Sequence, residues 1–185
     1  MKLYLLLLGA DSPGRNVEQH DYFFGIAENL QELVPEIKAF WPEAGKSLHV
    51  DGWREVNKVD SYRVQVVPQD DSPPANTHKL FFLNLGGYTH GKLEEQHYIV
   101  LTIQQNRVDA VQAAKKHVFF KTNSLKGIAT SHIDEKYGVD VDSIHQVEEL
   151  LSPALKAKYR VVISENTGLP EDEIHLGYFK LEKLK

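Results

Sequence analysis

Nearly uninterrupted apolar runs at 3–8 and 80–85 are the first regular feature of the chain. Such short runs are typical of buried strands, and each is followed by a glycine. A second segment rich in β-branched and aromatic residues follows at 17–27 and at 94–104, which indicates a second strand in each case. The pattern therefore predicts two strand–loop–strand units.

Apolar residues at helical spacing follow the first unit. Leu30, Leu33 and Ile37 would share one face of a helix over 29–41, and a counterpart is expected over 107–119. Further strands are expected at 47–56, 61–67, 128–134, 158–164 and 174–181. Strands outnumber helices in this pattern, which favours a fold with largely antiparallel sheet.

The two strand–loop–strand units are also related in sequence. At an offset of 77, residues 2–29 and 79–106 are identical at 11 of 28 positions, including the Glu-Gln-His segment of each copy. Self-similarity of this kind predicts a duplicated structural unit. The alignment continues beyond a short indel, with 48–51 matched to 131–134 and 59–61 matched to 141–143. A further match of 62–64 with 159–161 requires that a helix at about 144–157 was inserted into the second copy.

We therefore expect an α+β fold built from two tandem ββαββ-like repeats. Mostly antiparallel sheet would carry helices packed on one face, and a pseudo-twofold axis would relate the copies. The first repeat spans 1–67, and a proline-rich linker spans 68–78. The second repeat spans 79–185 and includes the inserted helix and a C-terminal strand.

The composition is that of a soluble globular protein. Of 185 residues, 42% are apolar and 25% are charged, and the net charge of −5 argues against nucleic acid as the main partner. The absence of cysteine fits a cytoplasmic setting and excludes thiol catalysis. The run Leu3–Leu8 has six residues. A signal peptide needs about 7–15 apolar residues and a membrane span about 18, so no membrane partner is expected.

Repeated polar residues on the predicted strands are the best candidates for chemistry. Because side chains alternate faces along a strand, Glu18 shares a face with His20, and His49 shares one with Asp51. Two imidazoles with carboxylates can hold zinc, manganese or non-haem iron, or can act as an acid–base pair. The same residues could instead form a buried hydrogen-bond network that joins the strands. The corresponding candidates in the second copy are Glu95, His97, His132 and Asp134.

The first loop of each copy carries two glycine positions and then a cation, in 9–15 and in 86–92. Such a loop can present backbone N–H groups and positive charge to an anion. Alternatively, it is a tight turn with positive φ at its glycines, and Arg15 pairs with a carboxylate such as Glu18. The candidate ligand-binding residues are Gly9, Gly14, Arg15 and Lys92.

The segment G-x4-G-R-x-x-E-Q-H-D at 9–21, followed by H-x-D-G-W at 49–53, resembles the bacterial family catalogued as domain of unknown function 1543. The strand–loop–strand start and the duplication are similar as well. The second copy departs from the motif, with Tyr98 in place of Asp21, Lys92 in place of Arg15 and Glu135 in place of Gly52. The resemblance implies a bacterial, cytoplasmic protein and favours the first copy as the site, but it implies no activity.

Two classes of function remain open at this point, and the sequence does not decide whether the chain is an enzyme. The first is a small-molecule enzyme or binder that uses the Glu18, His20, His49 and Asp51 cluster, with or without a metal ion, and Arg15 to hold an anionic group. The second is a non-catalytic interaction or assembly protein in which the His–carboxylate clusters are structural. A homodimer would then use an edge strand or the inserted helix.

Overall fold

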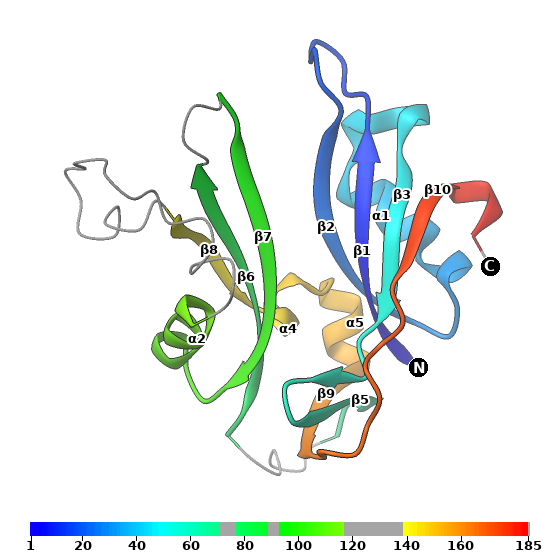
Figure 1. Cartoon of the computed structure of the whole chain (residues 1–185). Helices are drawn as coiled ribbons and strands as arrows, with labels where there is room; N and C mark the ends of the chain where they lie inside the picture. The colour runs from blue at the N-terminus through cyan, green and yellow to red at the C-terminus, as the bar shows by residue number, and fades with distance from the viewer. Residues whose placement is uncertain (71–76, 89–92, 117–138, 185) are drawn as a thin grey trace. The chain divides into compact units, whose positions relative to one another are not determined.

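The computed structural model describes residues 1–70, 77–88, 93–116 and 139–184 (Figure 1). They belong to two compact units. Residues 1–75 with 150–185 make the first unit, and residues 76–149 make the second. Among the described residues, no helix combines the length and apolar character needed to cross a bilayer.

A four-stranded antiparallel sheet is the centre of the first unit. It contains β1 (Lys2–Ala10), β2 (Gln19–Ala27), β3 (His49–Glu55) and β10 (His175–Lys180), in the order β10-β3-β1-β2 (Figure 1). The apolar run predicted at 3–8 lies within β1, which has a neighbour on each side. This interior position in the sheet explains why nearly every residue of the run is buried.

Short helices pack against this sheet. They are η1 (Leu30–Leu33), α1 (Val34–Phe40), η2 (Pro42–Ser47) and η4 (Leu181–Lys183). Asn29 caps η1, because its side chain accepts a hydrogen bond from the Glu32 N–H. Leu33 and Ile37 lie in one buried core with Leu8 of β1. The helix expected over the segment after β2 therefore forms, and its apolar face is buried as its periodicity predicts.

A smaller sheet completes the first unit. It contains β4 (Lys58–Val59), β5 (Tyr62–Pro68) and β9 (Tyr159–Glu165), all antiparallel. The inserted helix expected at 144–157 is wrong in its bounds, because α4 (Val147–Leu150) and α5 (Pro153–Lys158) are separate helices. Ser152 caps α5 through a hydrogen bond from the Leu155 N–H, and Pro153 cannot continue a preceding helix.

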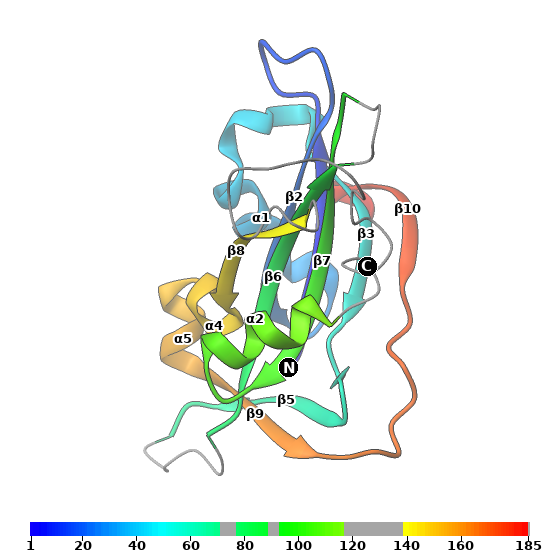
Figure 2. The ribbon, with the colours of Figure 1, turned by 60° about the vertical axis from the view of Figure 1, so that its left-hand side comes forward.

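In the described part of the second unit, a three-stranded antiparallel sheet carries a helix on one face. Its strands are β6 (Lys79–Tyr88), β7 (Glu95–Gln104) and β8 (Val139–Gln146), in the order β7-β6-β8. The helix α2 (Arg107–Lys115) lies against the sheet (Figure 2), and Ala110 and Ala114 join Phe81 and Leu83 in its core. Asn106 caps α2 by accepting from the Asp109 N–H, as Asn29 does in the first unit.

The strand registers of the two units correspond. Lys2 faces Ala27 in the first, and Lys79 faces Gln104 in the second, which is the same pairing at an offset of 77. The third strands correspond as well, since β3 and β8 both pair with the first strand and both shift register at one residue. In these registers Asp142 of β8 stands where Asp51 of β3 stands.

This correspondence corrects part of the sequence alignment. Residues 141–143 belong to the strand equivalent to β3, so their match with 59–61 is wrong. The strand expected at 128–134 and the end of the helix expected over 107–119 lie outside the described residues.

Sheet-dominated α+β structure is confirmed. Residues 150–185 pack with the first unit, and the expected C-terminal strand pairs with β3 as β10. The two compact units therefore differ from the predicted repeats 1–67 and 79–185. The repeat bounds remain a prediction.

Candidate functional site

Four polar side chains of the first unit converge beside Gly9 of β1. Gly9 faces His20 on β2 and His49 on β3, so two imidazoles flank a residue that has no side chain. Glu18 immediately precedes β2, and Asp51 belongs to β3. The predicted cluster of Glu18, His20, His49 and Asp51 is therefore brought together by the order β3-β1-β2.

A bulge sets the position of Asp51. Val50 faces Leu8 and Gly52 faces Leu7, so Asp51 is the extra residue of β3 at this register shift. Bulges redirect a side chain and occur next to functional sites. The sequence predicted a shared face for His49 and Asp51 from simple strand alternation. They do converge, but they do so because of the bulge, which is a departure from regular alternation.

The imidazoles and carboxylates of the cluster lie close together. His49 Nε2 is 3.1 Å from Glu18 Oε1 and 3.1 Å from Asp51 Oδ1. His20 Nε2 is 3.1 Å from Asp51 Oδ2 and 3.7 Å from Glu18 Oε2. Each imidazole therefore faces both carboxylates through its Nε2 atom.

The missing side chain of Gly9 leaves the space that the cluster uses. A Cβ atom at this position would lie 2.4 Å from Asp51 Oδ2 and 2.5 Å from His49 Nε2. The role predicted for Gly9, a turn with positive φ, is wrong, because Gly9 lies within β1 and its φ is not positive. Gly14 does have a φ of 75°, as predicted. Gly9 is thus needed for close approach, whereas Gly14 is needed for the turn.

The tautomer of His49 follows from its second nitrogen. His49 Nδ1 lies 2.7 Å from the Ser47 carbonyl oxygen, which can only accept a hydrogen bond. Nδ1 therefore carries a proton, and Nε2 is the ring nitrogen that points into the cluster. A backbone carbonyl that fixes one imidazole nitrogen while the other binds a metal is a common arrangement in metalloproteins.

Two buried atoms of the cluster lack hydrogen-bond partners among the described residues. They are His49 Nε2 and Asp51 Oδ2, the same two atoms that surround the space above Gly9. Carboxylate oxygens lie 3.1 Å from His49 Nε2, and His20 Nε2 lies 3.1 Å from Asp51 Oδ2, but none of these ion-pair contacts is a hydrogen bond. Buried polar atoms without partners are costly, so this site calls for a further group.

A divalent cation fits this arrangement. Two ligand atoms each about 2.1 Å from a cation, at about 90–109° to each other, lie roughly 3.0–3.4 Å apart. The separations of 3.1 Å between imidazole nitrogens and carboxylate oxygens match that spacing. Two imidazoles with carboxylates suit zinc, manganese and ferrous iron.

The floor of the cluster is buried and its mouth is open. The His49 side chain is 4% exposed, whereas those of Glu18 and His20 are 40% and 44% exposed. The ring of Tyr178 on β10 covers His49, with ring centres 4.2 Å apart. Burial raises the pKa of Tyr22, two residues beyond His20 on β2.

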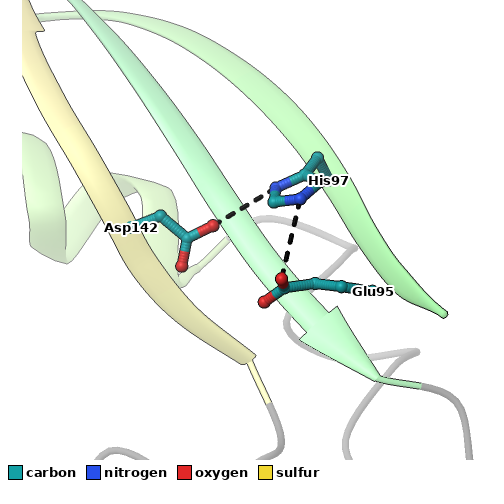
Figure 3. A group of neighbouring side chains, drawn as sticks. All are labelled: Glu95, His97 and Asp142. Carbon is teal, nitrogen blue, oxygen red and sulfur yellow. Dashed lines mark ion pairs between the residues drawn. The ribbon is translucent and has the colours of Figure 1, made fainter. Parts of the chain in front are cut away.

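A second cluster occupies the equivalent place in the second unit. Figure 3 shows Glu95 and His97 of β7 and Asp142 of β8 pointing toward one another, and one ligand atom from each lies within 4.8 Å of the others. His97 Nδ1 is 3.2 Å from Asp142 Oδ2, and His97 Nε2 is 3.8 Å from Glu95 Oε2. The sequence predicted Glu95 and His97 here but not Asp142. His132 and Asp134 lie outside the described residues.

The loop residues predicted to bind an anion lie in the turn between β1 and β2. Arg15 is exposed, and its backbone N–H donates to the Ser12 carbonyl oxygen. Glu18, which the alternative interpretation paired with Arg15, faces the two imidazoles. Lys92 lies outside the described residues.

A separate hollow of about 320 Å³ lies near Trp53 and His175, whose rings stack. Its carboxylates are already engaged. Asp172 accepts from the N–H groups of Asn57 and Lys58, and Glu171 pairs with the Lys58 side chain. This hollow therefore lacks the unpartnered polar atoms that mark the cluster beside Gly9.

The comparisons with known proteins agree with the family resemblance. Residues 15–66 match the family model described as Domain of Unknown Function (DUF1543), and this segment contains Glu18, His20, His49 and Asp51. The crystal structure of a protein Il1583 from Idiomarina loihiensis is similar over 97% of this chain and 97% of that chain. Its TM-score is 0.65 at 20% sequence identity, so the likeness shows a shared fold alone. None of the curated proteins compared with the chain matches it.

Proposed function

We propose that the chain is a metal-dependent enzyme acting on a small molecule, with its centre at the Glu18, His20, His49 and Asp51 cluster. The observation that carries the proposal is the buried His49 Nε2 atom, which faces carboxylates and has no hydrogen-bond partner among the described residues. The tandem ββαββ-like duplication belongs to the same proposal, supported by the matching registers of the two units.

His20, His49 and Asp51 are assigned as the ligands. His49 is held by the Ser47 carbonyl, and Asp51 is set by the bulge in β3. Three protein ligands leave coordination positions for water or substrate, as catalytic sites require and closed structural sites do not. When bound, the cation would act as a Lewis acid or would lower the pKa of a bound water.

Glu18 is assigned as the proton acceptor. It lies at the exposed mouth of the cluster, in the segment before β2, and it is near both imidazoles. A carboxylate at this position can take a proton from the water or from the substrate as either one enters. Because the mouth is open to solvent on the side of Glu18 and His20, a small molecule can reach the centre without displacing a helix or strand.

The test is the metal content of the purified full-length chain after loading with zinc, manganese or ferrous iron. We expect about one equivalent, lost in His49→Ala and retained in Glu18→Gln. His175→Ala is the matched control. It removes an imidazole of the same unit that lies on the edge strand β10 and stacks on Trp53, and that is not part of the cluster. No bound metal in the wild-type chain under any loading would refute the proposal and would favour the non-catalytic interaction protein.

A further inference from the structure

The two clusters differ at one position of the first strand. Leu7 of β1 and Asn84 of β6 stand at equivalent places, since each lies two residues before the glycine beside its cluster. Leu7 faces Gly52, and Asn84 faces Ser143, at the bulge of the third strand in both units. An apolar residue in the first cluster is thus replaced by an amide in the second.

The Asn84 amide reaches both facing groups of the second cluster. Its Nδ2 lies 3.2 Å from His97 Nδ1 and donates to Asp142 Oδ2 at 3.2 Å. The opposite orientation of the amide would place its carbonyl oxygen against the Asp142 carboxylate, so the donor orientation is the one that the chemistry allows. One NH2 group therefore supplies a hydrogen to the imidazole and another to the carboxylate.

The Asn84 amide therefore contacts the two groups of the second cluster that a cation would otherwise join. His97 Nδ1 lies 3.2 Å from both Asn84 Nδ2 and Asp142 Oδ2, and His97 Nε2 faces Glu95. In the first cluster Leu7 has no donor to offer, and the atoms without hydrogen-bond partners among the described residues are the ligand atoms His49 Nε2 and Asp51 Oδ2. In the second cluster the atom without a partner is Asn84 Oδ1, which belongs to the amide and not to the imidazole or the carboxylates. The second cluster also lacks an imidazole at the place of His49, where the register puts Asp140.

We propose that the Asn84 side chain takes the place of the cation in the second cluster, so that the chain binds one metal ion, in the first cluster. The inference rests on the proposed function for the first cluster. The part of the inference that concerns the second cluster depends only on the Asn84 contacts. It assigns the second cluster a structural role.

The test exchanges the residues at positions 7 and 84 and counts bound zinc or manganese by elemental analysis and calorimetry. Asn84→Asp replaces the donor NH2 group by an acceptor oxygen of the same shape, which adds a carboxylate to the second cluster. We expect this variant to bind two equivalents, one of which survives in the Asn84→Asp/His49→Ala double variant. Asn84→Leu is the companion variant, because it removes the donor without adding a ligand.

The reciprocal change tests the first cluster. Leu7→Asn introduces an amide, and we expect it to weaken binding there by about tenfold or more, whereas Leu7→Met should leave binding unchanged. Melting curves without metal separate these effects from misfolding, since Asn84→Asp should lower the melting temperature and added metal should restore it.

The outcomes separate this inference from the proposed function. Two equivalents in the wild-type chain, with one lost in His97→Ala, would overturn the inference and leave the first centre standing. One equivalent in Asn84→Asp and Asn84→Leu alike would also overturn it. No metal in the wild-type chain but one equivalent in Asn84→Asp would overturn the proposed function and support the role of Asn84. No metal in any of these proteins would overturn both.

Discussion

The His49 imidazole is fixed by the Ser47 carbonyl, which lies 2.7 Å from its Nδ1 atom, and this contact turns the Nε2 atom toward two carboxylates. Ser47 ends η2, two residues before His49 opens β3. The Ser47 side chain is itself anchored by donating to the Asp11 and Ala44 carbonyls. The orientation of the buried ring is therefore set by the helix end, before any ligand arrives.

Gly9→Ala is predicted to weaken metal binding without removing a ligand. The added Cβ would occupy the space beside His49 Nε2 and Asp51 Oδ2, so the affinity should fall by about tenfold or more. Calorimetry with zinc or manganese measures this directly. Gly86→Ala is the matched control, because its Cβ would meet Asp142 in the second unit and should leave the first centre intact. Equal affinities for Gly9→Ala and wild type would contradict the assigned position of the cation.

Tyr178→Ala is predicted to speed metal loss from the first cluster. The Tyr178 ring covers the His49 ring, so removing it opens the floor of the site to water. We expect release to a chelator to be several-fold faster, with little change in the melting temperature, because Tyr178 is itself 63% exposed. Tyr178→Phe keeps the ring and should release metal at the wild-type rate. Slow release in both variants would show that the ring does not protect the site.

Arg107→Ala is predicted to raise the pKa of Glu149 toward its ordinary value. Desolvation acts to raise this pKa, but hydrogen bonds from Arg107 and from the Gln146 N–H outweigh it, so the pKa is lowered from 4.5. A carboxyl with a depressed pKa stabilises the fold above its unfolded pKa and loses that contribution as the pH falls through the folded pKa. Both side chains are about half exposed, so the change in stability should be small.

Carbon-detected NMR titration of Glu149 measures this shift. Arg107→Lys is the informative comparison, since it keeps the positive charge but loses the second donor that Arg107 gives to the Ile144 carbonyl. A pKa of Glu149 that stays low in both variants would assign the shift to the Gln146 N–H alone.

Local patterns predicted most of the secondary structure. The apolar run at 3–8 corresponds to β1, and the segment at 17–27, rich in β-branched and aromatic residues, contains β2. The helix after β2 was predicted by the spacing of Leu30, Leu33 and Ile37, all of which are buried. Helix breaks were harder to place, and the single helix expected at 144–157 is divided before Pro153.

The second cluster shows where sequence alignment fails. The motif at 49–51 was matched to His132 and Asp134 by similarity across insertions, whereas the register places Asp142 at the position of Asp51. Strand pairing joins residues far apart in the chain, and residue similarity alone does not determine it. Asn84 did carry a visible signal, since it is the one strongly polar residue in the apolar run at 80–85.

The sequence by itself identified the members of the cluster in the first unit, because the period of a strand pairs Glu18 with His20 and the H-x-D motif keeps His49 near Asp51. Only the tertiary structure decided that these pairs meet, since β1 lies between β2 and β3 and presents Gly9 where their side chains converge. The bulge at Asp51 and the Ser47 contact were equally out of reach of the sequence. The bulge depends on the register between strands, which non-local packing sets, whereas the Ser47 contact joins residues two apart and depends on where η2 ends.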